Sequence, residues 1–186
     1  MSLFAFDPLQ LAIESFAKQG QVLEGLWPLS SLPRLHESTR RQNENEGACE
    51  VVWQMRGENR AARSGAPEIW LHLKSSADVE LTCQRCLQAV TLHISAARSF
   101  RFVHGEATAA ELDAQSEDDV LALSRVLDAR ELTEDELLLS LPLVPRHDIC
   151  PHPLVAPSAA SEAEAGARDE HPFAALAHLK RDNLLN

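Results

Sequence analysis

With 186 residues and 45% apolar side chains, the chain is long enough for one domain with a hydrophobic core and a tail. No apolar stretch is long enough to cross a membrane, and the N-terminus lacks the basic region of a secretory signal, so we expect a cytoplasmic protein with no membrane partner. The net charge is −11, and the whole acidic excess follows residue 105, where 17 acidic residues stand against 6 basic ones. An acidic surface repels a phosphate backbone and attracts a basic protein, although it can also serve solubility alone.

The first half of the chain predicts a helix followed by strands. Residues 9–18 show helical spacing behind Asp7-Pro8, and 22–27 fit a strand. Apolar and polar residues then alternate over four stretches: 49–56, 69–74, 79–83 and 90–94, the last running on towards Phe102. Short strands joined by short turns predict an antiparallel sheet. We expect loops around Pro33 and over 105–119, and one more strand at 120–123.

The centre of the chain is predicted to be a helix over 129–141. Asp128, with Glu131 three residues on, fits a capping box, and Thr133 with Glu136 gives a second such frame. Pro142 ends the helix because the residue before proline is disfavoured in helical geometry. Three consecutive carboxylates precede its leucine run: Glu134, Asp135 and Glu136. We expect these charges to face water and to form a partner-binding surface, while the leucines face a core.

The last part of the chain differs in composition from the rest. Residues 153–170 are rich in Pro, Ala, Ser and Glu and predict a flexible acidic linker. Residues 171–186 regain helical spacing, with Phe173, Leu176 and Leu179 on one side of a short helix, and we expect this segment to dock on a partner. The predicted architecture is therefore one α+β domain over 1–152, an antiparallel sheet covered by one or two helices, followed by a linker and a C-terminal helix.

The sharpest local motif is Cys83-Gln-Arg-Cys86. Two thiols three residues apart at a strand-to-strand turn form a knuckle that can hold one edge of a zinc ion. A structural zinc needs two further ligands, and Cys150 is our main candidate, with the remaining ones being His147, His152 and Cys49. A redox pair is the first alternative, but it requires a helix after the first cysteine, where the sequence predicts a strand. Two cysteines without a metal are the second alternative.

Three stretches resemble the YceD-like proteins, the large ribosomal RNA subunit accumulation proteins of bacteria and plastids. They are Cys-Gln-Arg-Cys-Leu at 83–87, Glu-Asp-Glu-Leu-Leu-Leu-Ser-Leu-Pro-Leu-Val-Pro-Arg-His at 134–147 and Pro-Phe-Ala-Ala-Leu-Ala-His-Leu-Lys at 172–180. Leu-Pro-Arg-Leu at 32–35 is similar too. The resemblance implies a cytoplasmic factor in the synthesis, processing or stability of the large-subunit (23S) ribosomal RNA. It carries over no catalytic residue.

We therefore expect a non-enzymatic factor in ribosome biogenesis whose partner is a precursor of the large subunit. The acidic second half favours contact through a basic ribosomal protein over direct contact with the RNA. The first alternative is an RNA-processing nuclease, which would need carboxylates clustered around Mg²⁺. Glu134, Asp135 and Glu136 are consecutive on a helix and so point in different directions, which argues against it. The second alternative is a zinc-ribbon-like interaction module.

Overall fold

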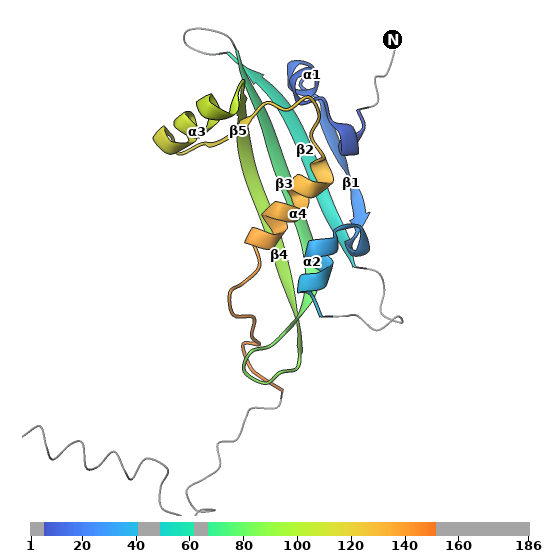
Figure 1. Ribbon diagram of the computed structural model, residues 1–186. Coiled ribbons are helices and arrows are strands. Elements are labelled where there is room, and N and C mark those ends of the chain that lie inside the picture. Colours follow the sequence, from blue (N-terminus) through green and yellow to red (C-terminus); the bar gives the residue numbers. More distant parts are fainter. Residues whose placement is uncertain (1–5, 41–48, 62–66, 152–186) are drawn as a thin grey trace, which may run out of the picture. The chain divides into compact units, whose positions relative to one another are not determined.

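A computed structural model describes residues 6–40, 49–61 and 67–151, which form a single α+β domain, as predicted. Its centre is one sheet with the strand order β1-β2-β3-β4-β5 (Figure 1). The strands are β1 (Val22–Pro28), β2 (Glu50–Arg60), β3 (Glu68–Thr82), β4 (Ala89–Val103) and β5 (Asp119–Ala122). The first four pair antiparallel, as the alternation predicted, but β5 pairs parallel with β4. The parallel pair arises because helix α3 (Glu106–Gln115) carries the chain back before β5 begins.

Strand β3 is longer than the sequence predicted. The stretches 69–74 and 79–83 belong to one strand, since the four residues between them have Cα partners in β4 from Ser75↔Ala96 to Asp78↔His93. Ser75 interrupts the apolar alternation but is itself buried. The polar residue at this position therefore made one strand look like two in the sequence. The pairing of β3 with β4 continues through it without a break.

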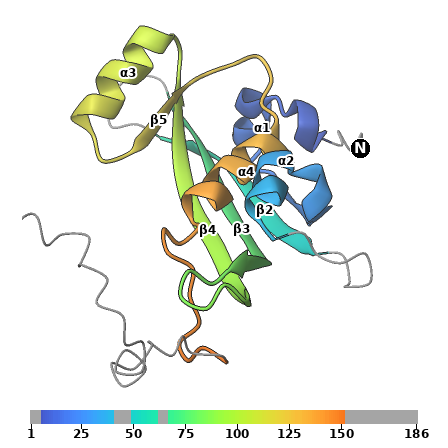
Figure 2. The ribbon, with the colours of Figure 1, turned by 60° about the horizontal axis from the view of Figure 1, so that its bottom comes forward.

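Helices cover one face of this sheet. They are α1 (Ile13–Lys18), α2 (Pro33–Ser38) and α4 (Ala129–Leu139), and α4 crosses over the central strands (Figures 1 and 2). Beneath them lie two groups of buried side chains. One group surrounds Phe16, Met55 and Leu71, and the other surrounds Leu35, Val79 and Leu137. Among the described residues no helix is both long enough and apolar enough to span a membrane.

The predicted helix over 9–18 is interrupted. A 3-10 turn, η1 (Pro8–Gln10), precedes α1, and Leu11 lies between them. The Leu11 backbone N–H donates to the Leu127 carbonyl at 2.8 Å, and the Leu127 N–H donates back at 3.0 Å. Because this bridge to the segment before α4 takes both backbone groups of Leu11, the helix cannot run through it.

Two segments predicted as loops contain helices. Around Pro33 the chain forms the short 3-10 turn η2 (Leu29–Ser31) and then α2, in which proline occupies the first turn. Residues 106–115 form α3, of which Ala109 alone is buried. A helix with one buried residue has no apolar stripe, so periodicity could not reveal it.

Helix α4 begins where the sequence predicted. Asp128 is its N-cap, and the carboxylate accepts hydrogen bonds from the backbone N–H groups of Arg130 at 2.9 Å and Glu131 at 3.2 Å. The second capping frame is not used, since the Thr133 hydroxyl is buried and donates to the Ala129 carbonyl at 2.7 Å. The helix ends at Leu139, two residues before the predicted end. The predicted linker over 153–170 and docking segment over 171–186 lie outside the described residues.

Candidate metal centre

The turn between β3 and β4 holds Cys83 and Cys86 in a fixed knuckle. The Cys83 N–H donates to the Gln88 carbonyl at 2.9 Å, and the Leu87 N–H donates to the Cys83 carbonyl at 2.8 Å. Both cysteine side chains are buried. Leu87 has a φ of 60°, the only positive value at a described non-glycine residue, and its side chain is 66% exposed. The tight backbone of this turn thus points two thiols inward at the cost of strain at Leu87.

The loop that follows α4 brings two more donors to this knuckle. Its backbone is attached by a hydrogen bond from the Gln84 N–H to the Pro145 carbonyl at 2.8 Å. As a result, one donor atom from each of four residues lies within 4.8 Å of all the others: Cys83, Cys86, His147 and Cys150. The described residues hold no second group of this kind, either of cysteine and histidine or of carboxylates.

The spacing of these donors fits a zinc ion. Tetrahedral zinc with bonds of about 2.3 Å to sulfur and about 2.0 Å to nitrogen holds neighbouring donors about 3.5–3.8 Å apart. The Sγ atoms of Cys83 and Cys150 are 3.8 Å apart, and Cys86 Sγ lies 3.4 Å from His147 Nδ1. Three thiols and one imidazole are a common ligand set of structural zinc sites.

The imidazole of His147 is oriented for binding through Nδ1. Its Nε2 lies 2.8 Å from the Ala89 carbonyl oxygen, which can only accept a hydrogen bond. The proton therefore sits on Nε2 in the neutral ring, and the lone pair of Nδ1 faces the three sulfur atoms. Metal-bound histidines in proteins usually donate their second ring N–H to a carbonyl or carboxylate in this way.

Electrostatics at the site favour the thiolate of Cys83, and thiolate is the form of cysteine that binds metal. Burial raises the pKa of Cys83, but backbone hydrogen bonds from Cys86, His147 and Arg85 outweigh it and lower that pKa to about 5. Burial raises the pKa of Cys86. The Arg85 Nε–H donates to Cys150 Sγ at 3.0 Å, and this hydrogen bond raises the pKa of Arg85. Arginine therefore balances part of the negative charge that three thiolates bring.

The structure selects among the ligands that the sequence left open. Cys83, Cys86 and Cys150 come together, and His147 is the fourth donor. Cys49 lies elsewhere, and its thiol donates to the Asp78 carbonyl at 3.0 Å. His152 lies outside the described residues. A local signal for His147 existed, since it stands three residues before Cys150, but only the folded loop shows that both reach the knuckle.

The expectation that the carboxylates of α4 face water is wrong for two of the three. Glu134 and Glu136 are buried, and Asp135 alone is half exposed. Glu134 Oε1 accepts hydrogen bonds from the backbone N–H groups of Arg34 at 2.7 Å and Leu35 at 3.0 Å, at the start of α2. Arginine side chains supply the charge partners of all three carboxylates. These residues therefore hold the domain together, and partner binding through them stays a prediction.

Arg34 on α2 and Arg98 on β4 pair with the carboxylates of this acidic turn. Arg34 contacts Glu134 through Nη2 at 3.0 Å and Asp135 through Nη1 at 2.6 Å. Arg98 Nε lies 3.3 Å from Glu136 Oε2. Burial raises the pKa of Glu136, an effect that Arg98 partly offsets. Glu134 and Asp135 thus share Arg34, while Glu136 pairs with Arg98. The three carboxylates bind guanidinium groups and do not form a cluster that could hold Mg²⁺.

Comparison with protein-family models places the chain in a known family. A family model described as "Large ribosomal RNA subunit accumulation protein YceD" matches residues 71–180. This stretch contains all four donors of the candidate metal centre and the whole of α4. No curated protein and no solved structure matches the chain.

Proposed function

The chain belongs to the YceD family, and from this membership we propose that it is a cytoplasmic, non-enzymatic factor in the synthesis, processing or stability of the large-subunit ribosomal RNA. The family match over residues 71–180 is the observation that carries the proposal. The match includes both loops that meet at the candidate metal centre, so we place that centre within the functional unit.

We propose that the Cys83, Cys86, His147 and Cys150 site holds one structural zinc ion. Four protein donors fill a tetrahedral shell and leave no position for a substrate or an activated water, which is the mark of a structural site. The ion would fasten the loop after α4 to the β3–β4 turn. Several apolar side chains exposed at this end of the molecule, namely Leu87, Leu143, Val144 and Ile149, would then keep a fixed arrangement.

Within the described part of the chain, the nuclease alternative has little support. Two-metal phosphodiester chemistry needs carboxylates that converge on Mg²⁺. The carboxylates of Glu134 and Glu136 are instead bound by Arg34 and Arg98. We therefore propose that the chain acts on the large-subunit precursor by binding and not by RNA cleavage.

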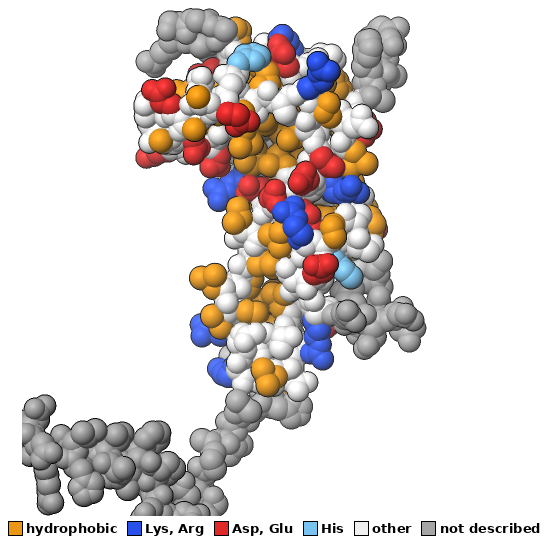
Figure 3. All heavy atoms as spheres, viewed as in Figure 1, with side chains coloured by type: hydrophobic (Ala, Val, Ile, Leu, Met, Phe, Trp, Pro, Cys, Tyr) orange, Lys and Arg blue, Asp and Glu red, His pale blue; other side chains and the backbone are white. Residues whose placement is uncertain are grey.

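The exposed acidic surface lies on α3, the loop after it and the first residue of β5, rather than on α4. Its residues are Glu106, Glu111, Asp113, Glu117, Asp118 and Asp119, all exposed. In Figure 3 acidic side chains gather in the upper half of the molecule, where α3 lies. We propose that this α3 surface attracts a basic ribosomal protein of the large-subunit precursor, with direct contact to the RNA as the alternative.

Capture from lysate tests both the function and the α3 surface. The tagged chain should enrich large-subunit RNA and proteins over those of the small subunit, and the protein contacts should survive ribonuclease. Glu111→Gln with Asp118→Asn should weaken capture about tenfold at low salt and flatten its salt dependence. Thr108→Ser with Gln115→Asn, which leaves every charge of the α3 surface unchanged, is the matched control. Capture that needs intact RNA and ignores these charges would refute the protein-mediated contact.

A second arm of the same experiment concerns residues 171–186, whose apolar residues Phe173, Leu176 and Leu179 we propose to be partner-binding. A chain that lacks this segment should keep its melting temperature within about 2 °C, since a segment that docks on a partner adds little to the stability of the domain. Association with large-subunit precursors should be lost. A large fall in melting temperature would show instead that the segment stabilises the domain itself.

A further inference from the structure

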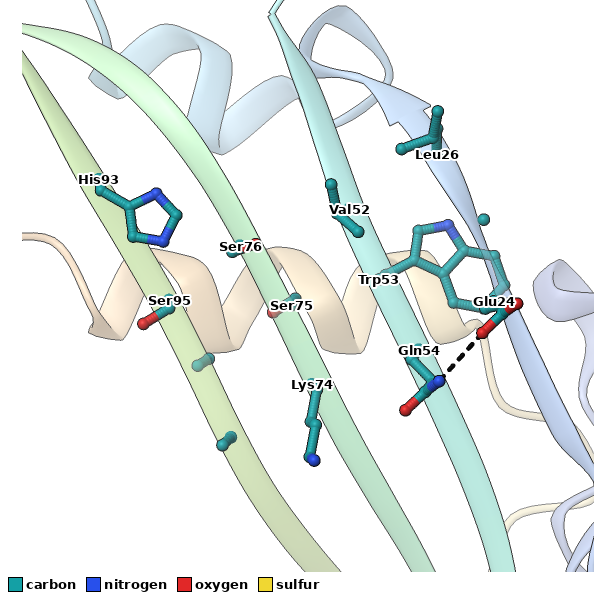
Figure 4. Close-up of a pocket in the computed structure, with 13 residues that line it drawn as sticks. Glu24, Leu26, Val52, Trp53, Gln54, Lys74, Ser75, Ser76, His93 and Ser95 are labelled. Carbon is teal, nitrogen blue, oxygen red and sulfur yellow. Dashed lines mark hydrogen bonds between the residues drawn. The ribbon is translucent and has the colours of Figure 1, made fainter.

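The face of the sheet opposite α4 carries a row of polar side chains that the proposed function does not use. Cα pairing places Arg56 on β2 opposite His72 on β3, and His72 opposite Ser99 on β4. Glu58 lies two residues beyond Arg56, on the same face of β2. Figure 4 looks onto this face further along the same strands, where Gln54, Lys74 and Ser95 lie on neighbouring strands with α4 beyond the sheet.

Ser99, His72 and Glu58 form a chain of short hydrogen bonds. Ser99 Oγ lies 2.8 Å from His72 Nδ1, and His72 Nε2 lies 2.7 Å from Glu58 Oε2. A nucleophile, a base and a group that orients the base are the three parts of an activated serine. Such a chain is recognised by its geometry and by the role of each group, not by position in the sequence.

Glu58 fixes which nitrogen of His72 acts as the base. Hydrogen bonds from Arg60 and His72 lower the pKa of Glu58, so its carboxylate is ionised and can only accept a hydrogen bond. The proton of the neutral imidazole is therefore on Nε2, next to Glu58. Nδ1 is left unprotonated, and the Ser99 hydroxyl donates to it. This is the proton arrangement that makes a serine hydroxyl nucleophilic.

Neighbouring side chains hold this arrangement in place. The His72 ring stacks parallel to Trp70, at 7° between the planes and 6.5 Å between centroids, and the Arg60 guanidinium lies 4.2 Å from the Trp70 ring. Two cationic residues, Arg56 and Lys74, line a hollow of about 240 Å³ together with His72 and Ser99. Arg56 also contacts Glu58, at 3.3 Å through Nη2. Positive charge beside a nucleophile stabilises an oxyanion that forms there.

We propose that Ser99 is an activated nucleophile that accepts an acyl group from an activated ester. Ser99 Oγ attacks the ester carbonyl carbon while its proton moves to His72 Nδ1, and the carbonyl oxygen becomes an oxyanion facing Lys74 and Arg56. The oxyanion collapses, the bond to the alcohol or phenol leaving group breaks with its electron pair, and the His72 proton passes to that leaving group. Acyl-Ser99 and the free alcohol are the products. The step ends at acyl-Ser99 and includes no turnover, so it goes beyond the proposed non-enzymatic function without contradicting it or depending on it.

The ordinary alternative is that the Ser99–His72 contact is a cross-strand hydrogen bond that only stabilises the sheet. An activated nucleophile and a structural hydrogen bond predict different reactivities for Ser99 relative to another serine on the same face of the sheet. Ser95 provides that internal standard, because it lies four residues away on β4 and its Cα partner is Ser76, not a histidine. A structural hydrogen bond gives Ser99 no advantage over Ser95.

The test treats the full chain with p-nitrophenyl acetate and locates the acetyl group by peptide mass mapping, which also separates serine products from those of cysteine and lysine. Ser99 should be acetylated about a hundredfold faster than Ser95, the lower range of general-base catalysis. Glu58→Gln should slow Ser99 at least about tenfold, and His72→Asn should bring it to the rate of Ser95. Equal rates at Ser99 and Ser95 in the unaltered protein would overturn the proposal without any variant having to fold.

Discussion

Replacing Cys83 with Ser should remove the bound metal and lower the melting temperature by about 10 °C or more. The serine hydroxyl is a poor zinc ligand, so three donors would remain where the structure brings four together. Binding of a structural metal contributes directly to the free energy of folding, and a loss of about 4 kcal/mol lowers the melting temperature of a domain of this size by about 8–16 °C. Removal of zinc by a chelator should reproduce the effect in the unaltered chain.

Cys49→Ser is the matched control for this experiment. The Cys49 thiol lies outside the metal centre and donates a hydrogen bond to the Asp78 carbonyl. The Cys49→Ser variant should therefore keep its metal and its sensitivity to chelator. Elemental analysis and thermal unfolding with and without chelator provide the measurements. If protein prepared without chelator contains no metal and unfolds at the same temperature as Cys83→Ser, the four residues do not form a zinc site.

The second large effect is expected at Glu134. Glu134→Ala should lower the free energy of unfolding by about 3 kcal/mol, because two backbone N–H groups at the start of α2 and the Arg34 guanidinium would lose their acceptor. Glu134→Gln should cost less, since the amide keeps one oxygen for the backbone. Urea unfolding of the purified variants measures the difference.

Asp135→Asn tests whether the expected effect of Glu134→Ala comes from the buried contact or only from the loss of one negative charge. Asp135 also contacts Arg34, at 2.6 Å, but its side chain is half exposed, so we expect a loss below about 1 kcal/mol. Equal losses at Glu134 and Asp135 would mean that the buried hydrogen bonds to α2 do not matter and that the effect is one of net charge.

The sheet and α4 could be predicted because their signals are local. Alternation of period two marks the strands, and the Asp128 cap marks the start of α4, as its two backbone hydrogen bonds confirm. Helix α3 escaped prediction because it buries only Ala109. The parallel placement of β5 was missed for the same reason, since a parallel neighbour needs a connection that carries the chain back, whereas a simple loop joins antiparallel strands.

The burial of Glu134 could not be predicted, because its partner Arg34 lies 100 residues away in the sequence. From the sequence alone, a run of charges on a helix is expected to face solvent. Only the folded structure shows that Arg34 and the start of α2 pack against Glu134. Similarly, the leucine run of α4 gave no hint that Leu137 is fully buried while Leu139 is 74% exposed. Which side chains at the end of a helix are buried depends on the elements that pack against that helix.

The metal centre was predicted in part. The knuckle of Cys83 and Cys86 is a local pattern, and Cys150 was the main candidate for a third ligand. The choice of His147 over Cys49 depended on the hydrogen bond between Gln84 and Pro145, which fixes the register of one loop on the other. No pattern in the sequence shows how these two loops align with each other.

The proposed function is tested most directly by deleting the gene for this chain in its own organism. The ratio of large-subunit to small-subunit ribosomal RNA is then measured in the deletion cells. The ratio should fall by about half or more, and it should recover when the unaltered chain is restored. Cys83→Ser, expressed to the same level, should restore it poorly if the metal centre belongs to the functional unit. An unchanged ratio in cells without the chain, at every growth rate tried, would contradict the account.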